Sequence, residues 1–354
     1  MQYRHLILLV LAVFTTKMHA QNIPLYVGTY TNEDAEGIYQ LQFNTETGTL
    51  SKQTLAIKID NPSFLEYSPN RKYLYSTNAT NSGFVSSYVV NDDGSLTMLT
   101  RMRSHGELPC HIALNKAGTK AAVSNYRGGT LAVFPINEDG TLSDASQVFD
   151  HNSEKTKSHA HSAHFVNDDL FVADLGTNSV FQYELKKGEY KLDTDAIVKV
   201  KGNPGPRHFT TTQDGEFIYV INEIESSVTS IKRSNNKFKE IDFDSTLSED
   251  FKGENASADI HLSKDEQFLY ASNRGENTIA VFKRHPKKGT LEKIQNASVH
   301  GDWPRNFAID PTGKFLIVAN RRSNNLVVFK IDPNTGELSF LQDHKTPTPV
   351  CLLF

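Results

Sequence analysis

The chain has 354 residues, of which 38% are hydrophobic and 22% charged, and its formal net charge is -4. These values are typical of a globular protein with a sizeable core and argue against a disordered chain. Lysine and arginine are spread along the sequence instead of forming a block, so we expect no nucleic-acid partner.

The first twenty residues have the layout of a secretory signal peptide. MQYRH is a short basic start, LILLVLAVF is a run of nine apolar residues, and TKMHA ends in the small residue Ala20. The alternative is a membrane anchor, but a membrane-spanning helix needs about 20 apolar residues. We expect cleavage near Ala20, a single domain over residues 21–354, no membrane span, and export to the periplasm or the cell exterior.

A period of about 48 residues runs through the rest of the chain. A short turn motif, such as DGTL at 139 or TGEL at 335, recurs with this period and places glycine where a tight hairpin needs a positive φ. Each unit holds four short strands, as in PRNFAIDP, FLIVAN, NLVVFKID and ELSFLQ. One strand of each unit ends in a polar residue, at steps of 49, 47, 49, 48, 51 and 47 residues: Thr29, Asn78, Asn125, Asp174, Asn222, Asn273 and Asn320.

Four-stranded sheets that repeat radially form a β-propeller, and seven units fill residues 22–354. A solenoid is the alternative, but it needs polar caps at both ends. This chain instead opens at a second strand, PLYVGTY, and ends with an extra strand, TPTPVCLLF. We predict an all-β, seven-bladed propeller with four-stranded antiparallel blades, in which the C-terminal strand completes the N-terminal blade and closes the ring.

In a propeller, the first strands begin and the second strands end at the same mouth of the central channel. Histidine, arginine, glutamate and aspartate are concentrated at these positions. Asparagine at a strand end caps the following turn through its side chain, and this role is favoured for Asn78, Asn125, Asn273 and Asn320. Turn capping does not account for Glu223, or for the charged residues in GPRHF and SNRG.

Four segments of this rim are SHAHSAHF with FVADLGTNSV, GPRHF with YVINEIESSV, DIHLSKDEQFLYASNRGENTIAVF, and WPRNFAIDPTGKFLIVANRRSNNLVVF. They resemble the lactonase family of seven-bladed propellers, which includes 6-phosphogluconolactonases and the fungal enzyme that cyclises carboxy-cis,cis-muconate. The resemblance covers the whole predicted mature chain. It implies a site in the channel mouth formed by these residues: His159 or His161, Arg207, Glu223 and Arg274. Further candidates for substrate binding are His208, Arg305, Asp174 and Asn125.

Hydrolysis of a lactone needs an activated water, donors for the developing oxyanion, and anchors for the substrate. Glu223 with a neighbouring histidine is suited to activate the water, and Arg207 and Arg274 to hold the carbonyl oxygen or an anionic group. No G-x-S-x-G nucleophile elbow is present, so we expect direct attack by water. Because phosphorylated sugar lactones form in the cytosol, an unphosphorylated aldonolactone is the expected substrate of an exported enzyme.

His159 and His161 are two residues apart, so on a regular strand they share a face and could chelate zinc. A third ligand at a suitable spacing is missing from the sequence pattern, and we expect neither a metal nor another cofactor. His164 is expected to point to the other side of the strand and to be structural. Cys110 and Cys351 are expected to be buried thiols, although an exported protein with two cysteines could hold one disulfide.

Two other functions stay open at this point. The same pair of arginines could hold an unsaturated diacid for lactone formation. A non-catalytic propeller could instead bind a carbohydrate or a protein partner on this rim, because one fold carries many functions. The identity of the lactone and the oligomeric state do not follow from the sequence.

Overall fold

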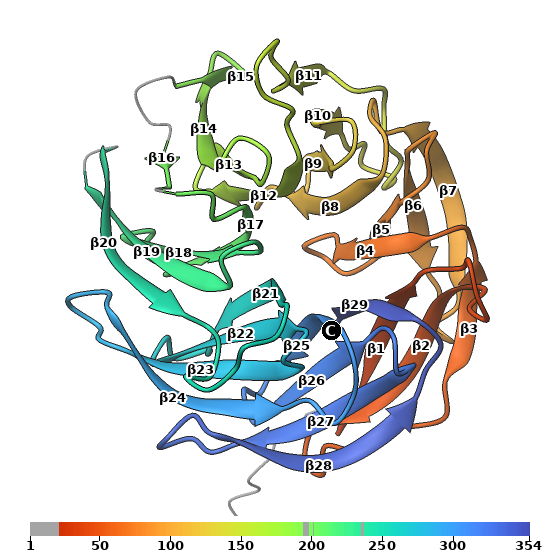
Figure 1. Cartoon of the computed structure of the whole chain (residues 1–354). Helices are drawn as coiled ribbons and strands as arrows, with labels where there is room; N and C mark the ends of the chain where they lie inside the picture. Colours follow the sequence, from red (N-terminus) through yellow and green to blue (C-terminus); the bar gives the residue numbers. More distant parts are fainter. Residues whose placement is uncertain (1–20, 194–197, 201, 235–236) are drawn as a thin grey trace, which may run out of the picture.

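The computed structural model describes residues 21–193, 198–200, 202–234 and 237–354. The predicted signal peptide, residues 1–20, lies outside the described residues. Seven antiparallel sheets follow one another in chain order around a central channel (Figure 1). This confirms the predicted all-β, seven-bladed propeller. Across the described ranges, no helix is long and apolar enough to cross a membrane.

From the channel outward, the first blade consists of β29 (Pro349–Leu353), β1 (Asn22–Thr29), β2 (Gly37–Asn44) and β3 (Thr54–Lys58). The second consists of β4 (Pro62–Tyr67), β5 (Tyr73–Asn78), β6 (Phe84–Val90) and β7 (Leu96–Arg103). The third consists of β8 (Pro109–Leu114), β9 (Lys120–Asn125), β10 (Thr130–Pro135) and β11 (Gln147–Asp150). The fourth consists of β12 (Ala160–Val166), β13 (Asp169–Asp174), β14 (Ser179–Lys186) and β15 (Glu189–Leu192), and the short β16 (Val198–Lys199) also pairs with β14.

The fifth blade consists of β17 (Pro206–Thr211), β18 (Phe217–Asn222), β19 (Ser227–Ser234) and β20 (Lys237–Ser245). The sixth consists of β21 (Ala256–Leu262), β22 (Phe268–Arg274), β23 (Thr278–Arg284) and β24 (Leu291–Ser298). The seventh consists of β25 (Pro304–Ile309), β26 (Phe315–Asn320), β27 (Asn325–Ile331) and β28 (Leu338–Lys345).

The two ends of the described chain meet in the first blade, as predicted. The C-terminal strand β29 pairs antiparallel with β1, with Tyr26 opposite Leu353 and Gly28 opposite Cys351. The thiols of Cys110 and Cys351 are both free and buried. Because β29 supplies the innermost strand of the first blade, the ring closes without an open sheet edge at this position.

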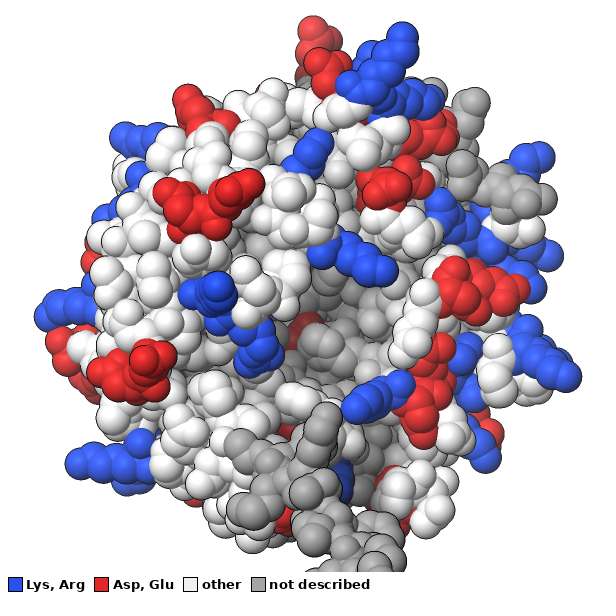
Figure 2. Space-filling model, turned by 180° about the vertical axis from the view of Figure 1, so that it is seen from behind, with Lys and Arg blue, Asp and Glu red and all other residues white. Residues whose placement is uncertain are grey.

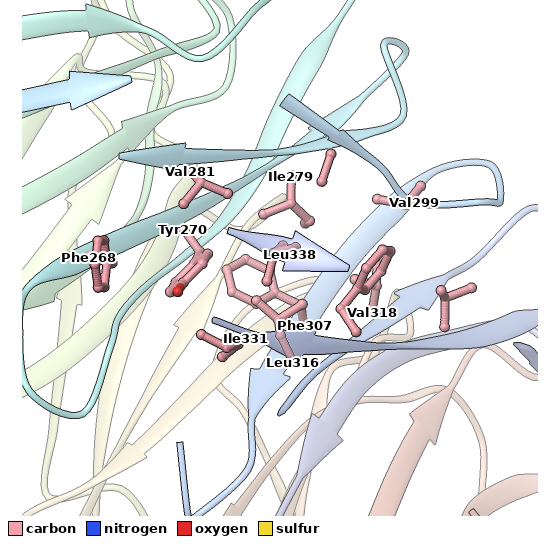
Figure 3. Close-up of a cluster of buried hydrophobic side chains, with 13 residues drawn as sticks. Phe268, Tyr270, Ile279, Val281, Val299, Phe307, Leu316, Val318, Ile331 and Leu338 are labelled. Carbon is pink, nitrogen blue, oxygen red and sulfur yellow. The ribbon is translucent and has the colours of Figure 1, made fainter. Parts of the chain in front are cut away.

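Neighbouring blades pack through apolar clusters built from the faces of their sheets. In the cluster between the sixth and seventh blades, Tyr270, Val281 and Phe307 pack with Leu316 and Val318 (Figure 3), and all five are at most 1% exposed. These residues come mostly from β-branched and aromatic runs, which suit a pleated surface covered on both sides. The seams between blades therefore supply the core of the ring.

Buried tyrosines also tie successive blades together. In four blades, a tyrosine of the second strand donates its hydroxyl hydrogen bond to a hairpin glycine carbonyl of the next blade. The pairs are Tyr26 with Gly94 at 2.7 Å, Tyr75 with Gly140 at 3.2 Å, Tyr219 with Gly289 at 3.0 Å, and Tyr270 with Gly336 at 3.0 Å. These glycines belong to the repeated turn motif of the sequence. The motif therefore serves both the turn and the contact between blades.

Every innermost strand contains a β-bulge near the end at which the inner strands begin. The register with the second strand jumps, for example, from Pro206 to His208 in β17 and from Pro304 to Asn306 in β25. A bulge leaves a residue unpaired and turns its side chain out of the regular alternation. The residues skipped in this way are Ser63, Cys110, His161, Arg207, Ala258 with Asp259, Arg305 and Val350.

Candidate active site

The channel widens into a cavity of about 390 Å³ where the inner strands begin and the second strands end. Seen from the side opposite to Figure 1, the ring is hollowed at its centre, with lysine and arginine side chains around the hollow (Figure 2). Three of the bulged residues, Cys110, His161 and Arg305, line the cavity, and the remaining lining comes from the ends of second strands and the loops that follow them, together with Leu108 directly before β8. These loop and strand-end residues are Tyr30, Asn32, Ala79, Leu108, Tyr126, Glu223, Arg274 and Arg321.

Glu223 lies between two arginines at the floor of this cavity. Its Oε2 atom is 2.9 Å from Nε of Arg207 and 2.8 Å from Nη2 of Arg274. The arginines are held in turn, because Nη1 of Arg207 donates to the carbonyl of Ala258 at 2.6 Å and Nε of Arg274 to that of Ala256 at 2.9 Å. The structure thus brings together three of the predicted site residues from the fifth and sixth blades.

Burial and the neighbouring charges together determine the protonation states of this cluster. Burial opposes the charge of Glu223, but Arg274, Arg207 and Arg305 hold the pKa of its carboxyl below the ordinary value. Burial, with the nearby positive charges of Arg274 and Arg305, lowers the pKa of Arg207 to about 9. At neutral pH the carboxylate is therefore ionised and the guanidinium still charged. Because both ion pairs use Oε2, Oε1 is the carboxylate oxygen that can orient a water molecule in the cavity.

The two histidines of the H-x-H motif have different positions. His161 lies on the bulge of β12, lines the cavity and is 4% exposed. Burial, then the charge of Arg207 and the neighbouring His208, holds the pKa of His161 well below its usual range, so its imidazole is neutral. His159 precedes the strand, stacks on Tyr126 at 4.6 Å between ring centroids, and has Nδ1 2.9 Å from the Tyr126 carbonyl. Of the two, His161 is placed to meet a substrate.

The outer wall of the cavity carries two further arginines. The guanidinium groups of Arg305 and Arg321 lie over the Tyr30 ring, 5.4 and 4.9 Å from its centroid. Among the described residues, neither forms an ion pair with a carboxylate. Arg305 is a predicted candidate, whereas Tyr30, Tyr126 and Arg321 are not. Their position directly after second strands is the sequence signal that points to them.

Three predicted substrate contacts do not line this cavity. Asp174 is fully buried, and its carboxylate accepts hydrogen bonds from Ser158 Oγ at 2.5 Å and the His159 amide at 2.9 Å, so it holds the entry to β12. Asn125 is also fully buried, and its Nδ2 atom donates to the Ser104 carbonyl at 2.8 Å and to Thr130 Oγ1 at 3.1 Å. His208 points the other way along the channel and lines a second cavity.

This second cavity lies deeper in the channel and corrects the expectation for His164. It has a volume of about 190 Å³ and is lined by His111, His164, His208 and His261 together with Asp259 and several phenylalanines. The strict alternation that would turn His164 away fails because the bulge at His161 shifts the register of β12. His159 and His161 both contact the Tyr126 ring, at 4.6 and 5.5 Å between centroids, but only His161 lines the main cavity.

No group of three or more histidine, cysteine, aspartate or glutamate side chains in the described ranges is arranged to hold a metal ion. The chemistry available in the main cavity is instead that of a neutral imidazole, one carboxylate and three guanidinium groups, with Arg207 paired to the carboxylate behind its wall. Such a set can accept a proton from water and stabilise negative charge on an oxygen.

The fold and this cavity define the class of the protein: a seven-bladed β-propeller with a cationic pocket at one mouth of its channel. The profile of the family described as "Lactonase, 7-bladed beta-propeller" matches residues 24–354. The chain belongs to this family, which confirms the predicted resemblance.

Three relatives are similar to this chain over most of its length. A 6-phosphogluconolactonase of Bacillus subtilis is 33% identical, over 81% of this chain and 85% of the relative. A 6-phosphogluconolactonase of Formosa agariphila is 35% identical, over 82% of this chain and 87% of the relative. The solved structure of a periplasmic gluconolactonase of Pseudomonas aeruginosa is 29% identical to this chain, with a TM-score of 0.88. The match covers 93% of this chain and 98% of the chain in that structure.

Proposed function

We propose that the protein hydrolyses the lactone of a sugar acid by direct attack of water in the main cavity. The observation that carries this proposal is the neutral, buried His161 in the same cavity as the Glu223 carboxylate and the arginines around it. A neutral imidazole can take a proton from water, whereas the guanidinium groups favour the oxyanion that forms on the lactone carbonyl. The lactonase relatives support the same reaction class.

In this mechanism each group has one task. His161 removes a proton from a water oriented by Glu223, and the hydroxide adds to the carbonyl carbon. Arg274 stabilises the developing oxyanion, since its guanidinium is already fixed by backbone carbonyls and needs no rearrangement. The ring oxygen then leaves with the proton, and the product is the open hydroxy acid. Arg305 and Arg321 hold its new carboxylate or another anionic group.

For the substrate we propose an unphosphorylated aldonolactone, and for the protein export from the cytosol. The proposal rests on the signal-like segment that ends at Ala20 and on the likeness to a periplasmic gluconolactonase. The three arginines that line the cavity favour an anionic product, which every lactone gives on opening. They would also accept a phosphate, so the two lactone types must be compared directly.

The test is a panel of lactones with acid release measured above the uncatalysed rate. The panel contains D-glucono-1,5-lactone, its 6-phosphate, other aldonolactones and a carboxymuconolactone. We expect saturable hydrolysis with the largest kcat/KM for an unphosphorylated aldonolactone. A larger value for the phosphate overturns the substrate proposal, and a larger value for carboxymuconolactone favours the cycloisomerase chemistry. Release from none of them, with tight binding to a glycan, indicates a non-catalytic propeller.

A further inference from the structure

The fourth blade departs from other blades at the end of its second strand. In four blades this strand ends in an asparagine whose Nδ2 atom donates to a backbone carbonyl in the segment that leads into the inner strand of the same blade. The pairs are Asn78 with Asp60 at 2.9 Å, Asn125 with Ser104 at 2.8 Å, Asn273 with Thr246 at 2.8 Å, and Asn320 with Val299 at 3.1 Å. The fourth blade has Asp174 at this place, and an ionised carboxylate cannot donate.

In the fourth blade the hydrogen bond runs in the opposite direction. Ser104, Thr246 and Val299 directly follow the outer strand of the preceding blade, and the equivalent residue before the fourth blade is His151, which follows β11. Here the side chain makes the contact, with Nδ1 of His151 3.0 Å from Oδ2 of Asp174. The two side chains are 4% and 0% exposed. The aspartate is therefore matched by a histidine at the position that it faces.

The hydrogens of this buried pair follow from its partners. Burial opposes the charge of Asp174, but hydrogen bonds from His151, from Ser158 and from a backbone amide hold the pKa of its carboxyl below the ordinary value. Because the ionised carboxylate only accepts, Nδ1 of His151 carries a hydrogen. Nε2 of His151 lies 2.5 Å from the hydroxyl of Tyr183, whose pKa is raised by burial, so the tyrosine keeps its hydrogen and donates it. The network runs from Tyr183 through His151 to Asp174.

Asp174 holds the part of the chain from which His161 projects. Its Oδ2 atom accepts from Ser158 Oγ at 2.5 Å, and its Oδ1 atom accepts from the His159 amide at 2.9 Å. Asp174 is also the partner of Ala160 in the ladder between β12 and β13, and the bulge that carries His161 starts directly after this pair. A bulged residue has no partner of its own, so its direction depends on the residues anchored on either side.

We propose that Asp174, with His151 and Ser158 as its donors, is a positioning residue that fixes the direction of His161 toward the main cavity. This inference rests on the proposed hydrolysis, in which His161 removes a proton from water. Hydrogen bonds to an ionised carboxylate are shorter and stronger than those to a neutral amide. The aspartate therefore holds the strand entry more firmly than an asparagine would, in the blade whose bulge carries the base.

The main test is Asp174→Asn, which introduces the residue that most other blades have at this place and keeps the shape of the side chain. An amide has one oxygen, so it cannot accept at both places of the carboxylate. We expect kcat for lactone hydrolysis to fall roughly 10- to 100-fold, because a displacement of about 1 Å in a reacting group can cost this much. KM should change by less than about 2-fold, since Arg305 and Arg321 hold the substrate from the seventh blade.

Further substitutions separate positioning from general stability. His151→Asn keeps an amide nitrogen at the place of Nδ1, whereas His151→Leu removes the donor to Asp174, so we expect the smaller loss of kcat in His151→Asn. Ser158→Ala removes one other donor and gives a milder variant with a lower kcat, which keeps the test open if Asp174→Asn does not fold. The control is Tyr270→Phe, which removes a buried hydrogen bond between the sixth and seventh blades and should lower the melting temperature at wild-type kcat.

A second readout needs no substrate. The imidazole ¹H and ¹⁵N signals of His161, identified by their absence in His161→Gln, should shift in Asp174→Asn and in Ser158→Ala but not in Tyr270→Phe. Unchanged signals in the folded Asp174 and Ser158 variants overturn the proposal, as does an unchanged kcat in them, or losses of kcat that only follow the melting temperature. If no lactone is hydrolysed at all, the proposed function fails, and the imidazole signals still decide the role of Asp174.

Discussion

The ionised state of Glu223 depends on two neighbouring arginines. Its charge is stable only because Arg207 and Arg274 approach the same carboxylate oxygen. The sequence pattern places all three where inner strands begin or second strands end, and the structure brings them together. The exact partner atoms could not be predicted, because they depend on the bulge at Arg207 and on how the neighbouring blades pack.

Replacing this carboxylate should damage hydrolysis more than folding. Glu223→Gln keeps the shape of the side chain but puts a neutral amide in place of the carboxylate that orients the water. It also leaves two buried guanidinium groups without a counter-charge, which costs some stability. We expect kcat/KM for lactone hydrolysis to fall roughly 100-fold or more. The matched control is Glu254→Gln, an exposed glutamate in the loop before β21. Equal losses in the two variants would contradict the assignment.

We propose that the arginines over Tyr30 bind the substrate and take no part in the chemical step. Arg321→Ala removes one of the two guanidinium groups that line the main cavity and have no carboxylate partner among the described residues. We expect KM to rise roughly 10-fold with kcat within about 2-fold, because the loss affects substrate and transition state alike. Arg322→Ala, the exposed neighbour stacked on Trp303 at 3.4 Å, is the control. A selective loss of kcat in Arg321→Ala would place this arginine in the chemistry instead.

At the scale of strands, the period of the sequence predicts the blades, their number and the ring closure. It does not predict the bulges, because a single unpaired residue leaves no periodic signal. As a result, His164 and His208 line the second cavity, and of the two histidines beside Tyr126 only His161 lines the main cavity. The alternation of side chains predicts which face of the sheet a residue takes along the regular part of a strand, but not beyond a bulge.

The contacts between blades can be tested at Tyr270 and Gly336. Tyr270→Phe leaves the buried Gly336 carbonyl without its 3.0 Å donor, at a cost of about 1–3 kcal/mol. Gly336→Ala should cost more, since φ is +74° and the added Cβ would lie 2.4 Å from the Phe268 ring. Chemical denaturation measures both, and Gly188→Ala, where nothing lies within 4 Å of the added Cβ, controls for strain at a φ of +87° alone. If Gly336→Ala cost no more than Gly188→Ala, the packing argument would be contradicted.

At the scale of the whole molecule, the channel holds histidines along its length and arginines at the mouth that forms the main cavity. Burial, with His208 and His261 nearby, lowers the pKa of His164 to about 3, and burial with Arg207 lowers that of His208 to about 4. Asp259 opposes both shifts, and His111 is lowered in the same way. The folded ring therefore holds these imidazoles neutral at pH values where an unfolded chain would protonate them.

This predicts a loss of stability in mild acid. Between the ordinary histidine pKa of 6.5 and the folded value of about 4, the unfolded chain binds more protons, so stability falls as pH decreases through this window. Below it, protonation of Glu223 and Asp259, whose pKa values are lowered in the fold, adds to the loss. Melting temperatures across the window should therefore drop, and His164→Gln should reduce the drop. A melting temperature that is flat with pH in the wild type would contradict this account of the channel.

The central claim is that the main cavity hydrolyses a lactone with His161 as the base. Its most direct test is the initial rate of acid release from D-glucono-1,5-lactone by the wild type, His161→Gln and His159→Gln. We predict a saturable wild-type rate, a fall of roughly 100-fold or more in His161→Gln, and a rate within about 5-fold of wild type in His159→Gln. A wild-type rate no greater than the uncatalysed one, or equal rates in the wild type and His161→Gln, would contradict the claim.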